Sequence, residues 1–488
     1  MIKYVLCFLL RKCHHNFLKT SIMTRNFFRR VGFGLSPEQE IPYDPLEWSK
    51  SQVDRLPEFN WTVGTISNMA MPTTKDGLDH FLQWRKDEDI LREKYGSNQA
   101  EYKKQKRFVR DKIKRKEQLE LRIRLNESLK SGSPVFERLL MFWSNHFAIV
   151  EKNELPQLIT GPYNREVIRA NLTGNIETLT REATISWAMI EALDNSESIA
   201  PNSIRAKKDR KKGKTPSLNE NHARELLELH TISPSAGYTQ EDVINVAYIL
   251  AGWKCEWSRK RKRFNPVKFD QESHQPGEHF VLGKGYKQRN VNSKLKLFDL
   301  IADLVRHPNC REFISTKLCR HFITDNPTKE MISPILKTWE ETDGDLPSIH
   351  KTLLEVAYVF APSTRKFHNP EIWMKQVLNL SGVKNPTILD AMTVYNDLGH
   401  NPLRPVQPNG FSDFEKDWIS PELLIRRLGY ADYLTASKGI KLFKNIEANE
   451  VIRKNFDNYE EIVSWLPDIK VERIKLSHLY ATEWMLYS

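Results

Sequence analysis

The chain has 488 residues, of which 40% are hydrophobic and 28% charged, and its formal net charge is +12. A chain of this length and composition can bury a large core and is typical of a soluble globular protein. No stretch reaches membrane-spanning length, which excludes a transmembrane array.

The positive charge is concentrated in three segments, 103–116, 207–214 and 259–263. Clusters of Lys and Arg attract phosphates and other anionic groups. They are equally typical of solvated helix faces and loops. An anionic polymer is therefore one predicted partner, with a merely solvated surface as the alternative.

The N-terminal region is ambiguous. Val5 to Leu10 is an apolar run between basic residues, too short for a membrane span and without a clear small-residue cleavage site. We therefore interpret residues 1–22 as a doubtful leader or an upstream start, with Met23 as the alternative first residue. Residues 23–64 contain prolines that disfavour compact helices before Thr73, so we expect an extended lead there and one helical domain over 65–488.

The cysteines at positions 7, 13, 255, 310 and 319 have no metal-ligand spacing. Their number and placement indicate a reducing compartment. We therefore expect a cytoplasmic protein.

Apolar residues recur at three- and four-residue intervals along most of the chain, which predicts a mainly α-helical fold. The predicted helices span 76–95, 99–130, 135–150, a segment capped by Asn164, 177–193, 218–231 and the region from Ser293 to the end, with 421 onward and 476–487 last. Residues 204–216 and 402–410 are predicted loops. One small β-hairpin is expected near 264–286, around the Pro276–Gly277 turn.

His146 stands beside the apolar stripe of the predicted helix 135–150. An imidazole in that position could enter a cleft as a general base or a metal ligand. The alternative is a histidine at the edge of the core, held by one hydrogen bond.

The predicted helix 218–231 is unusually rich in polar groups. Ser217 and Glu220 fit a capping box at its start. Glu220 and Arg224 share one face, and Glu225 lies on another with Asn221. These groups could line an active or metal site, or form a buried Arg–Glu–Asn network that organises helix packing.

A candidate cleft follows from the positions of these polar groups. We expect the helices around 135–150, 164–193 and 218–231 to meet there. Its candidate catalytic residues are His146, Asp194, Glu220, Arg224 and Glu225, and its candidate binding residues are Arg165, Arg169, Asn195, Asn219, Asn221 and His274. For Asp194 and Asn195 the alternative is local capping of a helix end. The sequence identifies no metal and no cofactor.

A set of motifs follows in a fixed order along the chain: Phe142–Phe147, Arg165–Arg169, Leu193–Asn195, Asn219–Glu225, Gly237–Val243, Gly252–Trp253, His307–Pro308, Lys317–Phe322, Gly344–Leu346, Pro370–Glu371, Leu398–Gly399 and a closing helix around Leu479–Met485. These motifs cover nearly the whole chain from about Met23. In this set and order the chain resembles the family called domain of unknown function 1800. The family has no assigned activity, so the resemblance implies a fold and no reaction.

The resemblance implies two further expectations. Many members look exported, which makes export the alternative to the cytoplasm. Members are often encoded beside proteins of the domain of unknown function 1501 family, which implies such a protein as a partner.

The chain departs from the family pattern at several positions. Gln275 stands in place of an acid and His279 in place of a lysine, in the segment that begins at His274. In the same way Ser144 replaces a frequent histidine, His400 a usual glutamine and Phe411 a usual tryptophan.

Two classes of function follow from these patterns. The first is an enzyme with a polar cleft that serves a hydrolytic or metal-assisted reaction. The second is an accessory or binding protein for an anionic polymer or a partner protein, in which the polar cluster is a structural network.

Overall fold

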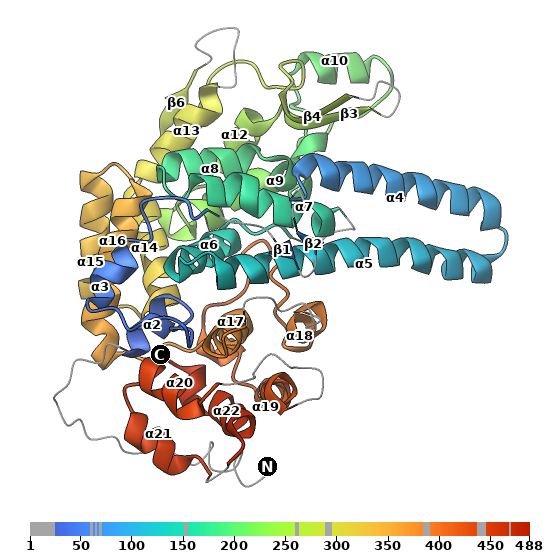
Figure 1. Ribbon diagram of the computed structural model, residues 1–488. Helices are drawn as coiled ribbons and strands as arrows, with labels where there is room; N and C mark the ends of the chain where they lie inside the picture. Colours follow the sequence, from blue (N-terminus) through green and yellow to red (C-terminus); the bar gives the residue numbers. More distant parts are fainter. Residues whose placement is uncertain are drawn as a thin grey trace.

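The computed structural model describes residues 25–58, 62–63, 66–67, 71–150, 155–258, 263–287, 295–383, 391–436, 446–467 and 470–488. Helices dominate these residues, and the strands among them form three antiparallel two-stranded sheets (Figure 1). The predicted fold class, mainly α with a small β-hairpin, is confirmed. No helix within the described ranges is long and apolar enough to cross a membrane.

The expectation of a helix-free lead is wrong. Helix α2 (Arg25–Val31) and helix α3 (Pro45–Lys50) both form there. Asp44 accepts hydrogen bonds from the second and third amides of α3, and Pro45 occupies a first-turn position where its missing N–H costs nothing. Pro45 therefore starts a helix in this segment and does not prevent one.

Helices α4 (Thr74–Tyr95) and α5 (Gln99–Lys130) confirm the predicted spans. Thr73 and Asp76 form a capping box at the start of α4, and Asn98 caps α5. The two helices run antiparallel, and their distal parts project from the rest of the molecule (Figure 1). The other half of α5 enters the core.

The next helices differ in detail from the prediction. They are α6 (Pro134–His146), α7 (Pro156–Tyr163), the π-helix η1 (Asn164–Arg169), α8 (Ile176–Ile185) and α9 (Trp187–Ala192). Asn164 continues α7 into η1 and does not cap a new helix. The predicted helix 177–193 is broken at Ser186, whose backbone is extended and whose hydroxyl accepts from the Met189 amide.

The region of the predicted polar helix is also built differently. It contains η2 (Asn195–Glu197), α10 (Ile204–Arg210), α11 (Asn221–Glu225), the π-helix η3 (Leu226–His230), η4 (Pro234–Ala236) and α12 (Gln240–Leu250). The predicted loop 204–216 is helical in its first half because Ser203 caps α10. The predicted capping box is absent: the Asn219 side chain accepts from the Asn221 amide, and Glu220 makes no cap hydrogen bond.

The predicted strand segments form, but they pair differently. Strand β3 (Trp253–Ser258) pairs with β4 (Arg263–Phe269), and β5 (His279–Val281) pairs with β6 (Lys284–Tyr286). A single hairpin across 264–286 is therefore wrong. The remaining pair is β1 (Thr62–Val63) with β2 (Ile66–Ser67). Each segment pairs with its sequence neighbour because a short turn is the least costly connection.

Helices resume after the hairpins, as predicted, and a loop covers 402–410. The elements are α13 (Leu295–Arg306), α14 (Pro308–Phe322), α15 (Lys329–Glu341), α16 (Leu346–Phe360), η5 (Ala361–Ser363), α17 (Pro370–Leu380), α18 (Ala391–Asp397), η6 (Glu415–Asp417), α19 (Pro421–Ala436), α20 (Ala448–Asn455), α21 (Tyr459–Trp465), α22 (Glu472–Tyr480) and α23 (Glu483–Leu486). Helix α2 packs against this region: the buried Arg29 donates to the backbone carbonyls of Asn455 and Trp484.

Two large hydrophobic clusters form the core. One gathers side chains between Phe27 and Ala357, the other side chains between Leu121 and Leu486. Helix α5 contributes Val109 and Ile113 to the first cluster, and Leu121 and Leu125 to the second. It therefore links the two cores, and its inner half lies between them.

Candidate functional site

His146 is buried, and both of its ring nitrogens have protein partners. The Lys317 ammonium lies 3.1 Å from Nδ1, and the carbonyl oxygen of His230 lies 3.2 Å from Nε2. Since the ammonium can only donate, Nδ1 accepts and Nε2 carries the proton. Burial, with Lys317 beside it, lowers the pKa of His146 well below its usual value and keeps the ring neutral.

Arg165 and Arg169 lie on η1 and bind carboxylates of other helices. Arg165 forms two hydrogen bonds with Glu120 on α5, at 2.6 and 3.1 Å. Arg169 forms two with Glu137 on α6, at 2.9 and 3.1 Å. These paired, largely buried ions fix η1 against both helices.

The polar residues of 219–225 lie nearer the surface. Arg224 contacts Glu220 at 3.4 Å and Gln240 at 2.9 Å, and the Arg224 and Glu220 side chains are 38% and 41% exposed. Exposed pairs of this kind contribute about 0–1 kcal/mol. Asn221 and Glu225 are half-buried.

Asp194, Asn195 and His274 lie around the end of α9 and the β3–β4 hairpin. Asp194 has a left-handed backbone with φ 58°. The buried Asn195 amide donates to the carbonyls of Leu250 and Trp253, at 3.2 and 2.7 Å. Nδ1 of His274 donates to the Ala251 carbonyl at 2.8 Å, so these groups tie loops to the hairpin.

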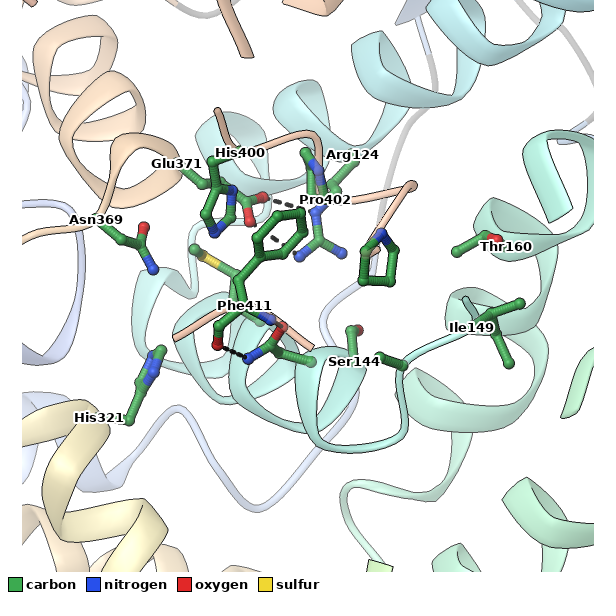
Figure 2. A pocket seen from close by; sticks show the side chains of 14 residues that line it. Arg124, Ser144, Ile149, Thr160, His321, Asn369, Glu371, His400, Pro402 and Phe411 are labelled. Carbon is green, nitrogen blue, oxygen red and sulfur yellow. Dashed lines mark hydrogen bonds and ion pairs between the residues drawn. The ribbon is translucent and has the colours of Figure 1, made fainter. Parts of the chain in front are cut away.

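A pocket elsewhere in the molecule is better suited to catalysis than the cleft predicted from the sequence. It lies where α5, α6, α14, α17 and the segment 398–413 meet, and its innermost cavity is about 20 Å³, room for about one water molecule (Figure 2). His321 and Asn369 lie on one side, and Ile149 and Thr160 on the other. Its described lining consists of Arg124, Met141, Ser144, Asn145, Ala148, Ile149, Thr160, His321, Asn369, Glu371, His400, Pro402, Pro405 and Phe411, and contains none of the residues predicted for the cleft.

His321 and Asp413 form a buried pair at the pocket. Nδ1 of His321 lies 2.7 Å from Oδ1 of Asp413. Burial raises the pKa of Asp413, but His321, Lys366 and Lys317 outweigh burial and hold it well below its usual range. Burial lowers the pKa of His321 despite the carboxylate. The ring is therefore neutral at neutral pH, donates from Nδ1 to Asp413 and carries its lone pair on Nε2.

Arg124 and Glu371 form the charged wall of the pocket. Nε and Nη2 of Arg124 donate to the two carboxylate oxygens, at 2.6 and 3.2 Å. The Lys375 ammonium lies 2.8 Å from the same carboxylate, and both Lys375 and Glu371 are almost fully buried. Burial raises the pKa of Glu371, but Arg124 and Lys375 together lower it far below its usual value. Burial lowers the pKa of Lys375 to about 8.

The segment 398–413 closes the pocket and is fixed by Asn145. The Asn145 side chain donates to the Phe411 carbonyl at 2.8 Å and accepts from the Phe411 amide at 2.7 Å (Figure 2). Gly410 adopts φ +72°, and a Cβ there would lie 2.5 Å from the Asn145 carbonyl oxygen. Only glycine fits this approach. The Phe411 ring then stacks on His400 with centroids 4.1 Å apart.

Three buried polar atoms at the pocket have no hydrogen-bond partner among the described residues. They are Oγ of Ser144, Nε2 of His321 and Nδ1 of His400. Buried polar groups are nearly always paired, so an orphaned one indicates a bound water or ligand atom. Three of them around a water-sized cavity indicate a site for water or for a polar ligand group.

Some patterns in the sequence already pointed to this pocket. Glu117, Glu120, Arg124 and Glu127 recur every three or four residues, which places a charged face on an otherwise apolar part of α5. That spacing could have identified Arg124, but Asp413 has no local signal at all. His321 and Glu371 stood in motifs of the resemblance that could bind anions or form a helix surface, and neither was a candidate site residue. The departures Ser144, His400 and Phe411 all line the pocket.

Metal ligands do not gather in the described parts of the chain: no three His, Cys, Asp or Glu side chains there come together as a metal site. We therefore assign no ligand role to any of these residues.

Comparison with known proteins identifies a family. The model of a family described as "Protein of unknown function (DUF1800)" matches residues 26–475. No curated protein and no solved structure matches the chain.

Proposed function

The chain belongs to the DUF1800 family of proteins of unknown function, and from the chemistry of its pocket we propose that it is a hydrolytic enzyme with His321 as general base. The observation that carries the proposal is the state of the His321 ring. Its Nδ1 is held by Asp413 at 2.7 Å, while its buried Nε2 has no partner among the described residues, and His321 lines the pocket that contains a cavity of water size. A carboxylate on Nδ1 fixes the tautomer in which Nε2 accepts a proton.

In this proposal a water molecule in the cavity is the nucleophile. Its oxygen attacks the electrophilic carbon or phosphorus of the substrate, and one of its protons passes to Nε2 of His321. Asp413 stabilises the imidazolium that forms. The bond to the leaving group then breaks, and the proton on Nε2 passes to that group. The orphaned Ser144 hydroxyl and His400 Nδ1 are the groups available to orient the water.

Ser144 is less suited to be the nucleophile itself. No hydrogen bond joins its hydroxyl to His321 within the described part of the chain. A serine nucleophile requires a base within hydrogen-bonding reach. Water is therefore the nucleophile we propose.

The test uses the full chain with chromogenic carboxylic esters, amides, phosphate esters and glycosides. His321→Asn keeps an N–H near the position of Nδ1 and removes the base at Nε2. It should lower kcat by about 100-fold or more with KM little changed. His80→Asn, at an exposed histidine of α4, is the matched control and should retain full activity.

Two outcomes would contradict the proposal. One is a folded native protein that hydrolyses none of the four classes. The other is His321→Asn with kcat within a few-fold of native. Elemental analysis of the same preparations separates the metal-assisted version of the reaction: a stoichiometric metal that is lost in His321→Asn would make His321 a ligand instead of a base.

A further inference from the structure

The projecting arm, formed by α4 and residues 99–116 of α5, has an asymmetric charge. Residues 99–116 carry nine Lys and Arg residues against two acids, whereas α4 carries five basic residues against six acids. The two helices pack through an apolar seam that includes Phe81, Trp84, Val109 and Ile113. The seam fixes which side of α5 faces α4 and which side faces outward.

The cations of α5 that face α4 are paired with its acids. Lys106 pairs with Glu88, and Lys112 lies 3.1 Å from Asp87. These contacts hold the arm together.

The outward cations form one continuous row. Lys103, Arg107, Arg110 and Lys114 recur at intervals of four, three and four residues, so they lie on one face of α5, and all four are exposed. We call this row the basic stripe. At 1.5 Å of rise per residue it is roughly 16 Å long. Like charges so arranged repel one another, and a bound polyanion relieves that repulsion.

An exposed aromatic ring follows Arg107 of the basic stripe by one position, about 100° further around α5. Phe108 is 59% exposed, although it sits on a helix that has an apolar seam available on its other side. Lys104 precedes it by one turn and is also exposed. Cations along a row bind a phosphate backbone, and an exposed ring offers a surface on which an unpaired base can stack.

We propose that the basic stripe and Phe108 bind single-stranded nucleic acid, with the phosphates along the stripe and a base on the Phe108 ring. An exposed aromatic ring distinguishes this ligand from a duplex, whose bases are already stacked, and from an acidic protein, which has no bases. The surface is separate from the pocket of the proposed function. Failure of one proposal therefore leaves the other standing.

The experiment measures fluorescence anisotropy of a labelled oligothymidylate with the full chain across about 50–200 mM salt. Native protein should lose about 50-fold in affinity over that range if four phosphates are contacted. The variant Lys103→Gln/Arg107→Gln/Lys114→Gln should bind about tenfold or more weakly at the lowest salt, with a salt slope shallower by about 2. The matched control Lys86→Gln/Arg92→Gln/Lys94→Gln removes three exposed charges from α4 and should bind like native.

Phe108→Leu separates stacking from simple charge attraction. It should weaken oligothymidylate binding about fivefold or more and leave binding of heparin, a polyanion without bases, unchanged. Three results would overturn the proposal: no oligothymidylate binding at the lowest salt, equal weakening by the α4 control, or native affinity in Phe108→Leu. The last result, together with competition by polyglutamate, would assign the surface to an acidic protein.

Discussion

Replacing the shared carboxylate of the pocket wall tests the electrostatic account of the fold. In Glu371→Gln the side chain keeps its shape and loses its charge. Arg124 and Lys375 then remain buried together, and three hydrogen bonds to the carboxylate, at 2.6, 3.2 and 2.8 Å, are weakened or lost. Removing one partner from a buried ion pair costs about 3–5 kcal/mol because the remaining charge is uncompensated.

The structure also limits the expected loss to the lower part of that range. Glu371 compensates two cations, and burial, together with Coulomb repulsion from Arg124, already lowers the pKa of Lys375. Without Glu371, Lys375 should lose its proton, which relieves part of the penalty. We therefore expect a loss of about 3–4 kcal/mol in the free energy of unfolding. Glu371→Gln/Lys375→Met should recover part of it, since the second change removes an unpaired buried amine.

The assay is urea unfolding at pH 7, followed by circular dichroism. Glu341→Gln is the matched control, because its partner Lys337 is 3.7 Å away and both side chains are exposed. That control should change stability by less than about 0.5 kcal/mol. A loss below about 1 kcal/mol in Glu371→Gln, or no recovery in the double variant, would refute the reasoning.

Two further predictions concern the same region. Burial raises the folded-state pKa of Glu127 to about 7 from a usual value of 4.5, so its contribution to stability is complete below about pH 4.5 and is lost as the pH rises through about 7. Glu127→Gln should reduce that decline, which is measured as the difference in the free energy of unfolding between pH 5 and pH 7.5. An equal difference in the native protein and the variant would exclude Glu127 as the cause. Gly410→Ala should destabilise the protein by about 1–3 kcal/mol, because it combines a left-handed backbone with a Cβ 2.5 Å from the Asn145 carbonyl oxygen. Gly399→Ala is the control, because Gly399 has the same φ of +72° and open space around an added Cβ, so only the backbone strain contributes there. An equal loss of stability in the two variants would show that the contact with Asn145 contributes nothing.

Local sequence patterns were sufficient to predict the span of a helix where that span depends on neighbouring residues. The spans of α4 and α5 follow from apolar spacing and from caps at Thr73 and Asn98. The same reasoning was wrong at Asn164 and Ser217, which look like caps. Tyr163 and Asn164 continue one helix into a π-turn, where Arg165 and Arg169 reach Glu120 and Glu137. Buried ion pairs there outweigh a cap of about 1 kcal/mol.

The sequence by itself determined the fold class, the family and most helical spans, because periodicity and capping involve residues within a few positions of one another. Only the tertiary structure decided the pocket. Arg124 and Glu371 are 247 residues apart, and His321 and Asp413 are 92 apart. A histidine becomes a candidate base only when a distant carboxylate holds one nitrogen and burial leaves the other unpaired, and neither condition has a local signature in the chain.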